Sequence, residues 1–153
     1  MKQIKSKKGF TLIELLIVIA VISIIVGIAL PRFKGIQDEG NIIRVKGDLR
    51  TLQTAVESFY IHNSNAYPRT GSNFSVDLLA ASPQIISVMP KDPYNPGNSY
   101  GYDLGGANDQ SYVIFSEGTL GTGSAAIDGS GNFTETNGAS CIYVSNIAED
   151  IAP

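Results

Sequence analysis

The residue that most clearly requires a chemical explanation is Glu14, because it is an acidic side chain inside a long apolar stretch. The stretch covers residues 10–30, and only Thr11, Glu14 and Ser23 interrupt it. A carboxylate inside an apolar span is costly to bury, and it marks a functional position that should meet a positive partner. The alternative is that Glu14 reaches the membrane surface from the end of a plain anchor.

The apolar stretch is long enough to span a membrane, and the residues just before it are strongly basic. As a helix, the 21 residues of the stretch would be about 32 Å long, which is enough to cross the core of a bilayer. The positive-inside rule then places residues 1–8 in the cytoplasm and predicts a single-pass protein whose C-terminal part lies on the other side. Residues 1–8 contain Lys2, Lys5, Lys7 and Lys8 and no acid, whereas the rest of the chain holds 7 basic and 14 acidic side chains.

The helical pattern continues beyond the span but becomes one-sided. Apolar residues recur in steps of three and four from residue 42 to residue 59, which predicts a single buried stripe. We therefore predict one helix over residues 10–62, with a kink or local opening at Pro31, where Gly27 also weakens the helix. The stripe consists of Ile42, Val45, Leu49, Leu52, Val56 and Phe59.

Residues 63–153 have the composition of turns and short strands. A small antiparallel sheet laid against the apolar stripe would bury both apolar faces. The predicted fold class is therefore α+β, with a long N-terminal transmembrane and amphipathic helix packed on a small antiparallel β-sheet. The predicted elements are a short helix or turn at 78–80, a hairpin of strands at 100–102 and 112–115, and further strands near 125–127 and 141–144.

Composition argues against several functional classes. The lone Cys141 excludes an internal disulfide and a site made of several thiolates, and we interpret it as a small buried side chain. A net charge of −3 gives no reason to expect nucleic acid as a partner. Phosphate-binding glycine motifs are missing from the sequence, and one histidine gives no independent support for a hydrolase. We therefore predict no enzymatic activity and no cofactor.

The run Lys7-Lys8-Gly9-Phe10-Thr11-Leu12-Ile13-Glu14 resembles the class III signal of type IV pilins, of type II secretion pseudopilins and of related subunits. The resemblance implies that a membrane-embedded prepilin peptidase cuts between Gly9 and Phe10 and methylates the new terminal amine. It further implies that Glu14, together with Thr11, serves filament assembly, with the carboxylate pairing with the terminal amine of a neighbouring subunit.

The same resemblance implies a division of the chain and a type IV pilin-like fold. Residues 1–9 would be a cleaved leader, 10–30 a transmembrane and filament-core helix, 31–62 its amphipathic continuation and 63–153 a periplasmic, β-rich part. The helix would loosen at Gly27 and Pro31 in the assembled filament; a static kink is the alternative. The implied location is the bacterial inner membrane and then a periplasmic or surface filament. The implied partners are further copies of the chain, prepilin peptidase, an inner-membrane assembly platform and minor pseudopilins.

The resemblance leaves two branches of this family open as the assignment of the chain. Similarity to the major, G-type pseudopilin of type II secretion rests on Tyr67-Pro68, on Pro90-Lys91-Asp92-Pro93-Tyr94 and on Ser116-Glu117-Gly118. The chain departs from that pattern where closely spaced aspartates would bind calcium, because the next acid is Asp128. Calcium needs several oxygen ligands, and Asp128 is the single candidate ligand for calcium in this loop. The alternative is a type IV pilin of a surface fibre, and a membrane-anchored periplasmic binding domain is a remoter one.

Overall fold

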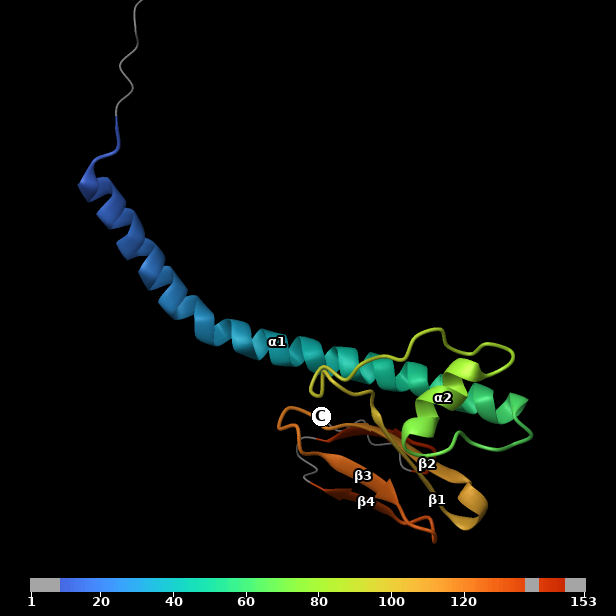
Figure 1. Cartoon of the computed structure of the whole chain (residues 1–153). Helices are drawn as coiled ribbons and strands as arrows, with labels where there is room; N and C mark the ends of the chain where they lie inside the picture. Colours follow the sequence, from blue (N-terminus) through green and yellow to red (C-terminus); the bar gives the residue numbers. More distant parts are fainter. Residues whose placement is uncertain (1–8, 137–140, 148–153) are drawn as a thin grey trace, which may run out of the picture. The chain divides into compact units, whose positions relative to one another are not determined.

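The computed structural model describes residues 9–136 and 141–147, and the chain divides after Asp38 into two compact units (Figure 1). The first unit contains the start of the long helix α1, and the second contains its remainder together with all other elements. The elements are α1 Leu12–His62, α2 Ser72–Ala80, β1 Gly101–Gly105, the 3₁₀ helix η1 Ala107–Asp109, β2 Ser111–Ser116, β3 Ser124–Ile127, β4 Phe133–Thr136 and β5 Ile142–Ser145.

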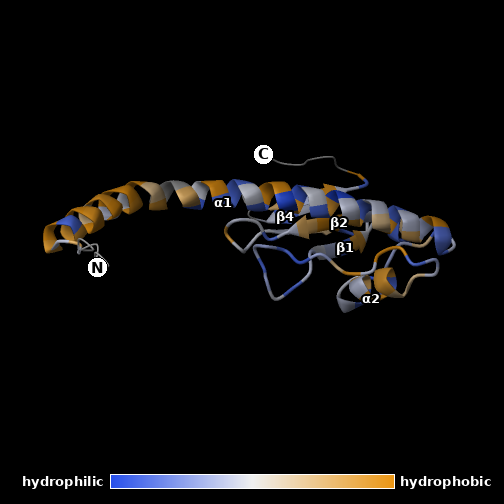
Figure 2. Ribbon diagram, turned by 90° about the horizontal axis from the view of Figure 1, so that it is seen from above, coloured by the Kyte–Doolittle hydropathy of each residue, from blue (hydrophilic) through white to orange (hydrophobic). Residues whose placement is uncertain are grey.

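The first unit is an isolated apolar helix. All large apolar side chains between Leu12 and Leu30 are exposed, and Figure 2 shows this part of α1 mostly in the hydrophobic colour. Its length and composition suffice to cross a membrane. Such a surface is stable only where lipid or other apolar helices cover it, because water would face it otherwise.

The second unit is built on the one-sided part of α1. The predicted stripe is confirmed, since Val45, Leu49, Leu52 and Val56 are almost completely buried and Phe59 is 8% exposed. The stripe packs against one face of the antiparallel sheet β1-β2-β5. Alternate strand residues point to opposite faces of a sheet, so every second strand residue contributes to this face. The strand residues on this face are Tyr102, Tyr112, Ile114, Ile142 and Val144.

The opposite face of the sheet is covered by the hairpin β3–β4. Val113 and Tyr143, the alternate residues of β2 and β5, pack against Ala125 and Ile127 of β3. The two layers approach closely at Gly105, where an added Cβ would collide with the backbone oxygen of Ile127. The second unit thus has three layers: helix α1, the three-stranded sheet and the two-stranded hairpin.

The predicted α+β class is therefore correct, and several details differ from expectation. The helix begins at Leu12 rather than residue 10, because Thr11 occupies the N-cap position, and it ends at His62 as predicted. Instead of one sheet there are two in the described residues, and β4 was not predicted. The helix α2 covers nine residues rather than three.

An ion pair fastens the loop after α1 to α2. The guanidinium of Arg69 donates to both carboxylate oxygens of Asp77, at 2.7 and 3.1 Å, and the Arg69 backbone N–H also donates to Asp77 at 2.9 Å. The hydrogen bonds from Arg69 hold the pKa of Asp77 below its ordinary value. This contribution to stability is therefore present above the unfolded pKa of Asp77 and is lost as pH falls through its folded pKa.

We expect Asp77→Asn to lower the free energy of unfolding by at most about 1 kcal/mol at pH 7, because Arg69 is largely exposed and the pair is screened by water. At pH values below the folded pKa of Asp77 the variant and the parent should be equally stable, since protonation has already weakened the pair. Denaturant unfolding of the full chain in detergent at both pH values measures the difference. Glu135→Gln, at an exposed strand position, serves as the control, and an undiminished difference at low pH would contradict the assignment.

Candidate processing and assembly site

Thr11 and Glu14 form a reciprocal cap at the start of α1. The backbone N–H and the hydroxyl of Thr11 donate to Glu14 Oε2 at 2.9 and 2.8 Å. In return, the Glu14 backbone N–H donates to Thr11 Oγ1 at 3.3 Å. This is the capping-box arrangement, in which a Thr and a Glu three residues later satisfy the free N–H groups of the first turn. The carboxylate also complements the positive end of the helix dipole.

The chain just before this cap is open to solvent. Gly9 and Phe10 precede the helix without regular structure, Phe10 is 86% exposed, and nothing lies within 4 Å of a Cβ built at Gly9. The peptide bond between these two residues is therefore sterically accessible in the precursor. The lysines of the predicted leader, residues 1–8, lie outside the described residues.

Of the predicted site residues, the structure brings Thr11 and Glu14 into contact and places Gly9 and Phe10 directly before them. The cap itself was missed, although the Thr-x-x-Glu spacing is a sequence signal that would have found it. The helix α1 is assigned without interruption through Gly27 and Pro31. Loosening of the helix at these two residues in a filament stays a prediction.

The candidate calcium ligand Asp128 has a role in a turn. Its carboxylate accepts the backbone N–H groups of Ser130 and Asn132, both at 2.8 Å, and the Asn132 side-chain amide at 2.9 Å. The Asn132 hydrogen bonds hold the pKa of Asp128 below its ordinary value, so the group is ionised at neutral pH. Within the described residues, no group of three or more His, Cys, Asp or Glu could hold a metal ion. Calcium binding stays a prediction.

Cys141 is a free, buried thiol. It packs beside Ala125 and Tyr143 in the core between the sheet and the hairpin, and burial raises its pKa to about 11. A thiol with so high a pKa is almost wholly protonated at neutral pH and is a poor nucleophile. The interpretation of Cys141 as a small apolar core residue is consistent with this environment.

Two of the tyrosines connect the strands to α1 by hydrogen bonds. The Tyr100 hydroxyl donates to Asp48 Oδ2 at 2.8 Å, and the Tyr112 hydroxyl donates to Glu57 Oε1 at 2.6 Å. Their rings are buried in the main core. Burial raises the pKa of both hydroxyls, so they remain protonated donors throughout the physiological pH range.

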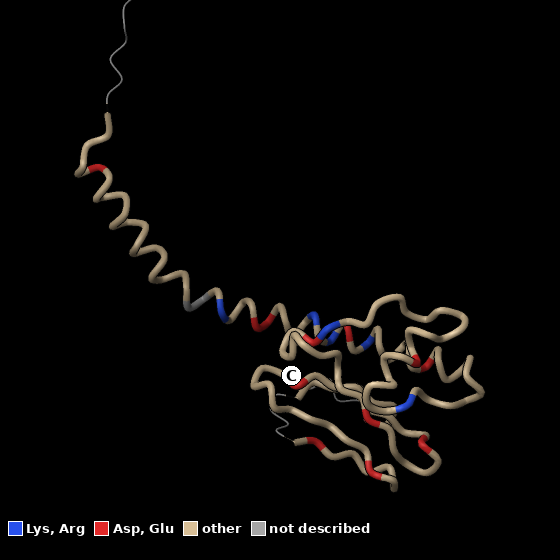
Figure 3. The backbone as a smooth tube through the Cα atoms, viewed as in Figure 1, with Lys and Arg blue, Asp and Glu red and all other residues tan. Residues whose placement is uncertain are grey.

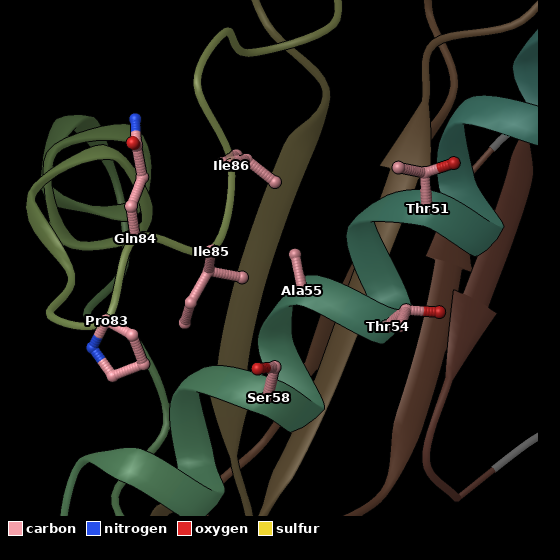
Figure 4. A pocket seen from close by; sticks show the side chains of 8 residues that line it. All are labelled: Thr51, Thr54, Ala55, Ser58, Pro83, Gln84, Ile85 and Ile86. Carbon is pink, nitrogen blue, oxygen red and sulfur yellow. The ribbon is translucent and has the colours of Figure 1, made fainter.

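The groove beside α1 offers little chemistry. Its walls are residues 51–58 of α1 and the segment Pro83–Ile86, and Figure 4 shows Ile85 lying beside Ala55. None of its eight lining residues is titratable. The hydroxyls of Thr51 and Thr54 donate to carbonyl oxygens of their own helix at 3.0 Å. The groove therefore has no titratable side chain among its lining residues that could activate one of these hydroxyls.

The comparisons with known proteins point to the segment that contains the cap. Residues 4–30 match the family described as "Prokaryotic N-terminal methylation motif". The type II secretion system core protein G of Pseudomonas aeruginosa is 28% identical over 110 residues, which cover 65% of this chain and 75% of that protein. The chain shows no significant match to a solved structure.

Further relatives come from both branches. Core protein G of Klebsiella michiganensis is 30% identical over 96 residues, which cover 63% of each chain. The type IV major alpha-pilin of Moraxella bovis is 34% identical over 86 residues, or 56% of this chain and 54% of the pilin. The matched regions span less than two thirds of these two relatives. The chain carries the prokaryotic N-terminal methylation motif of the type IV pilin-like family and is a homologue of type II secretion core protein G and of type IV pilins.

Proposed function

We propose that the chain is a structural subunit of a type IV pilus-like filament, made as a precursor and assembled after cleavage between Gly9 and Phe10. The observation that carries this proposal is the exposed Gly9–Phe10 bond directly before the capped, largely apolar first part of α1. An anchor needs only the helix. The glycine, the phenylalanine and the carboxylate at residue 14 of an otherwise apolar span are additional features that processing and assembly explain.

The proposed orientation follows from charge. The four lysines of residues 1–8 hold the leader at the cytoplasmic face, and the second unit lies in the periplasm. Cleavage removes these lysines and creates a positive amine at Phe10, four residues before Glu14 and two residues before the helix begins. The apolar helix then leaves lipid for a bundle of identical helices, and this transfer costs little because both surroundings are apolar. The chain itself acts as a substrate of its peptidase and has no enzymatic activity of its own.

The intact mass of the mature protein tests the processing step. We expect a first residue of Phe10, with the leader of nine residues removed and one methyl group added to the amine. Gly9→Val should leave the leader attached, because a β-branched residue would crowd the cleavage site. Val88→Ala, at an exposed position of the second unit, serves as the control and should be processed normally. A mature chain that still begins at Met1 would refute the proposal.

Within this function, we propose the pseudopilus of type II secretion rather than a surface fibre. Core protein G relatives from Pseudomonas aeruginosa, Klebsiella michiganensis, Escherichia coli and Vibrio cholerae support this branch, and the first of these alignments covers 75% of the relative. A pilin function remains the second candidate, because the Moraxella bovis pilin and fimbrial proteins of Pseudomonas aeruginosa are also similar. The further partners would be an inner-membrane assembly platform and minor pseudopilins.

Deletion of the gene separates the two branches. Loss of secreted proteins from the medium, with surface fibres retained, is expected for a pseudopilin. Loss of fibres with secretion intact would favour the pilin. The Glu14→Ala precursor, returned to the deletion strain, should behave like the deletion, whereas the parent gene should restore the lost function.

A further inference from the structure

The hydroxyl of Tyr102 is buried without a hydrogen-bond partner. Tyr102 lies in β1 and is 8% exposed, and its hydroxyl oxygen is the only buried side-chain nitrogen or oxygen among the described residues that lacks a partner. A hydroxyl taken out of water costs free energy unless a partner replaces the water, so folded proteins rarely keep one in this state. Burial raises the pKa of this hydroxyl, which therefore stays protonated and neutral. The cost is that of an unpaired neutral hydroxyl, and it weakens whatever covers the ring.

The element that covers this ring is the helix α2. The Phe74 ring of α2 stacks on the Tyr102 ring, with the ring centroids 4.2 Å apart and the planes at 4°. Within α2, all of whose residues are described, only Phe74 and Leu78 are buried, whereas α1 contributes the whole buried stripe to the same core. The remaining attachment is the pair of Arg69 with Asp77, in which the Arg69 side chain is 69% exposed. The helix α2 is therefore held by few contacts.

Both ends of α2 can act as hinges. Gly71 is the N-cap residue, has a φ of 68° and gives the helix no side-chain cap. This backbone conformation carries no penalty for glycine, which has no Cβ. Residues 63–71 and 81–99 flank the helix as long irregular segments, in which the described structure has only the isolated bridge between Lys91 and Ser99 (Figure 1). An element with few buried contacts between irregular segments can open while the rest of the unit stays folded.

We propose that α2 is a lid, which moves away from Tyr102 while α1 and the sheet stay packed. Water then reaches the Tyr102 hydroxyl, and its hydration offsets part of the lost burial of Phe74 and Leu78. Tyr102 therefore sets how often the lid opens. The open form presents the chain around the Arg69–Thr70 bond as an extended stretch that a protease can bind. In cells, the population of this open form limits how long the chain survives proteolysis.

Trypsin can report on the lid because its sites are sparse beyond α1. Arg69 and Lys91 are the only lysine or arginine residues after Arg50, and Figure 3 shows how few basic positions the second unit has outside α1. In the full chain purified in detergent, we expect the cut after Arg69 to precede the cut after Lys91, whose neighbour Asp92 is buried. A first cut after Lys91, with the bond after Arg69 intact, would overturn the lid.

Tyr102→Phe gives the decisive comparison. It removes the unpaired hydroxyl and keeps the ring that stacks on Phe74, so we expect the cut after Arg69 to slow about tenfold, on the scale of one buried unsatisfied hydroxyl. Tyr112→Phe is the matched control, because the Tyr112 hydroxyl donates to Glu57 at 2.6 Å and its loss should not slow the cut. An unchanged or faster cut in the Tyr102 variant, or equal slowing in the control, would contradict the proposal.

Hydrogen exchange of the same preparation distinguishes the lid from unfolding of the whole second unit. We expect the amides of α2 to exchange at least about tenfold faster than those of β2, the central strand of its sheet. In Tyr102→Phe the exchange of α2 should slow. Equal exchange in α2 and β2 would mean that the second unit opens only as a whole, and the lid would be wrong. The lid lies in the second unit alone, so these measurements succeed or fail independently of the processing and filament assembly proposed above.

Discussion

Glu14→Gln should stop filament assembly almost as completely as Glu14→Ala, although the two changes affect the start of the helix differently. Glutamine can keep the cap with Thr11, because its side-chain oxygen accepts the same hydrogen bonds, whereas alanine removes it. Both remove the negative charge. Leaving a positive amine unpaired in apolar packing costs about 3–5 kcal/mol, which corresponds to a loss of roughly two to four orders of magnitude in each contact.

The measurement is the sheared filament fraction relative to processed, membrane-inserted subunit. Insertion should be unchanged, since the remaining apolar span is intact. Ser23→Ala is the matched control, because Ser23 is another polar residue of the span and its hydroxyl only donates to the Ile19 carbonyl of its own helix at 2.7 Å. Normal filaments from the glutamine variant, with failure of the alanine variant, would show that Glu14 acts as a helix cap and that its charge is dispensable.

Leu52→Ala should destabilise the second unit by about 2–5 kcal/mol, a large share of the 5–15 kcal/mol that stabilises a typical domain. Leu52 is 0% exposed and lies in the core between α1 and the sheet, so its removal leaves a cavity as well as losing buried apolar area. The expected consequence in cells is degradation of the subunit before assembly.

Denaturant unfolding of the purified full chain in detergent gives this value. The chain has seven tyrosines and no tryptophan, so tyrosine emission reports on the core directly. Ile43→Ala on the same helix is the control, and its cost should be near 0.5 kcal/mol because Ile43 is 72% exposed. Similar losses of unfolding free energy for both variants would mean that the buried stripe contributes no more to stability than the exposed side of the helix.

The helix and its buried side were predictable because their signals are local. The apolar residues from Ile42 to Phe59 recur every three or four positions over several turns, and this spacing places them all on one side of a helix. The hairpin β1–β2 was predictable because tyrosines in the first strand and the aromatic and β-branched run Tyr112–Phe115 in the second flank a glycine-rich turn. The cap was equally local, since Thr11 and Glu14 stand three residues apart.

The remaining features depend on contacts between residues that are far apart in the sequence, so no short stretch of sequence contains their signal. Strand β4 is mostly exposed, so Phe133–Thr136 lacks the apolar alternation by which strands are recognised. Helix α2 has no side-chain cap at Gly71, and its start therefore carries no signal. The bonds from Tyr100 to Asp48 and from Tyr112 to Glu57 join residues 52 and 55 positions apart, and only the folded layers bring them together.

These two tyrosine bonds also have a consequence for the response of the second unit to a force along α1. Asp48 and Glu57 lie nine residues apart on α1, about 13.5 Å along its axis, and each is fastened to a different part of the strand layer. A pull along α1 therefore loads both bonds and the apolar stripe between them in parallel, as shear. An interface loaded in shear separates only when its contacts break together, whereas an interface that is peeled apart loses one contact at a time. The second unit can therefore transmit tension applied along α1 to the sheet that packs on this helix.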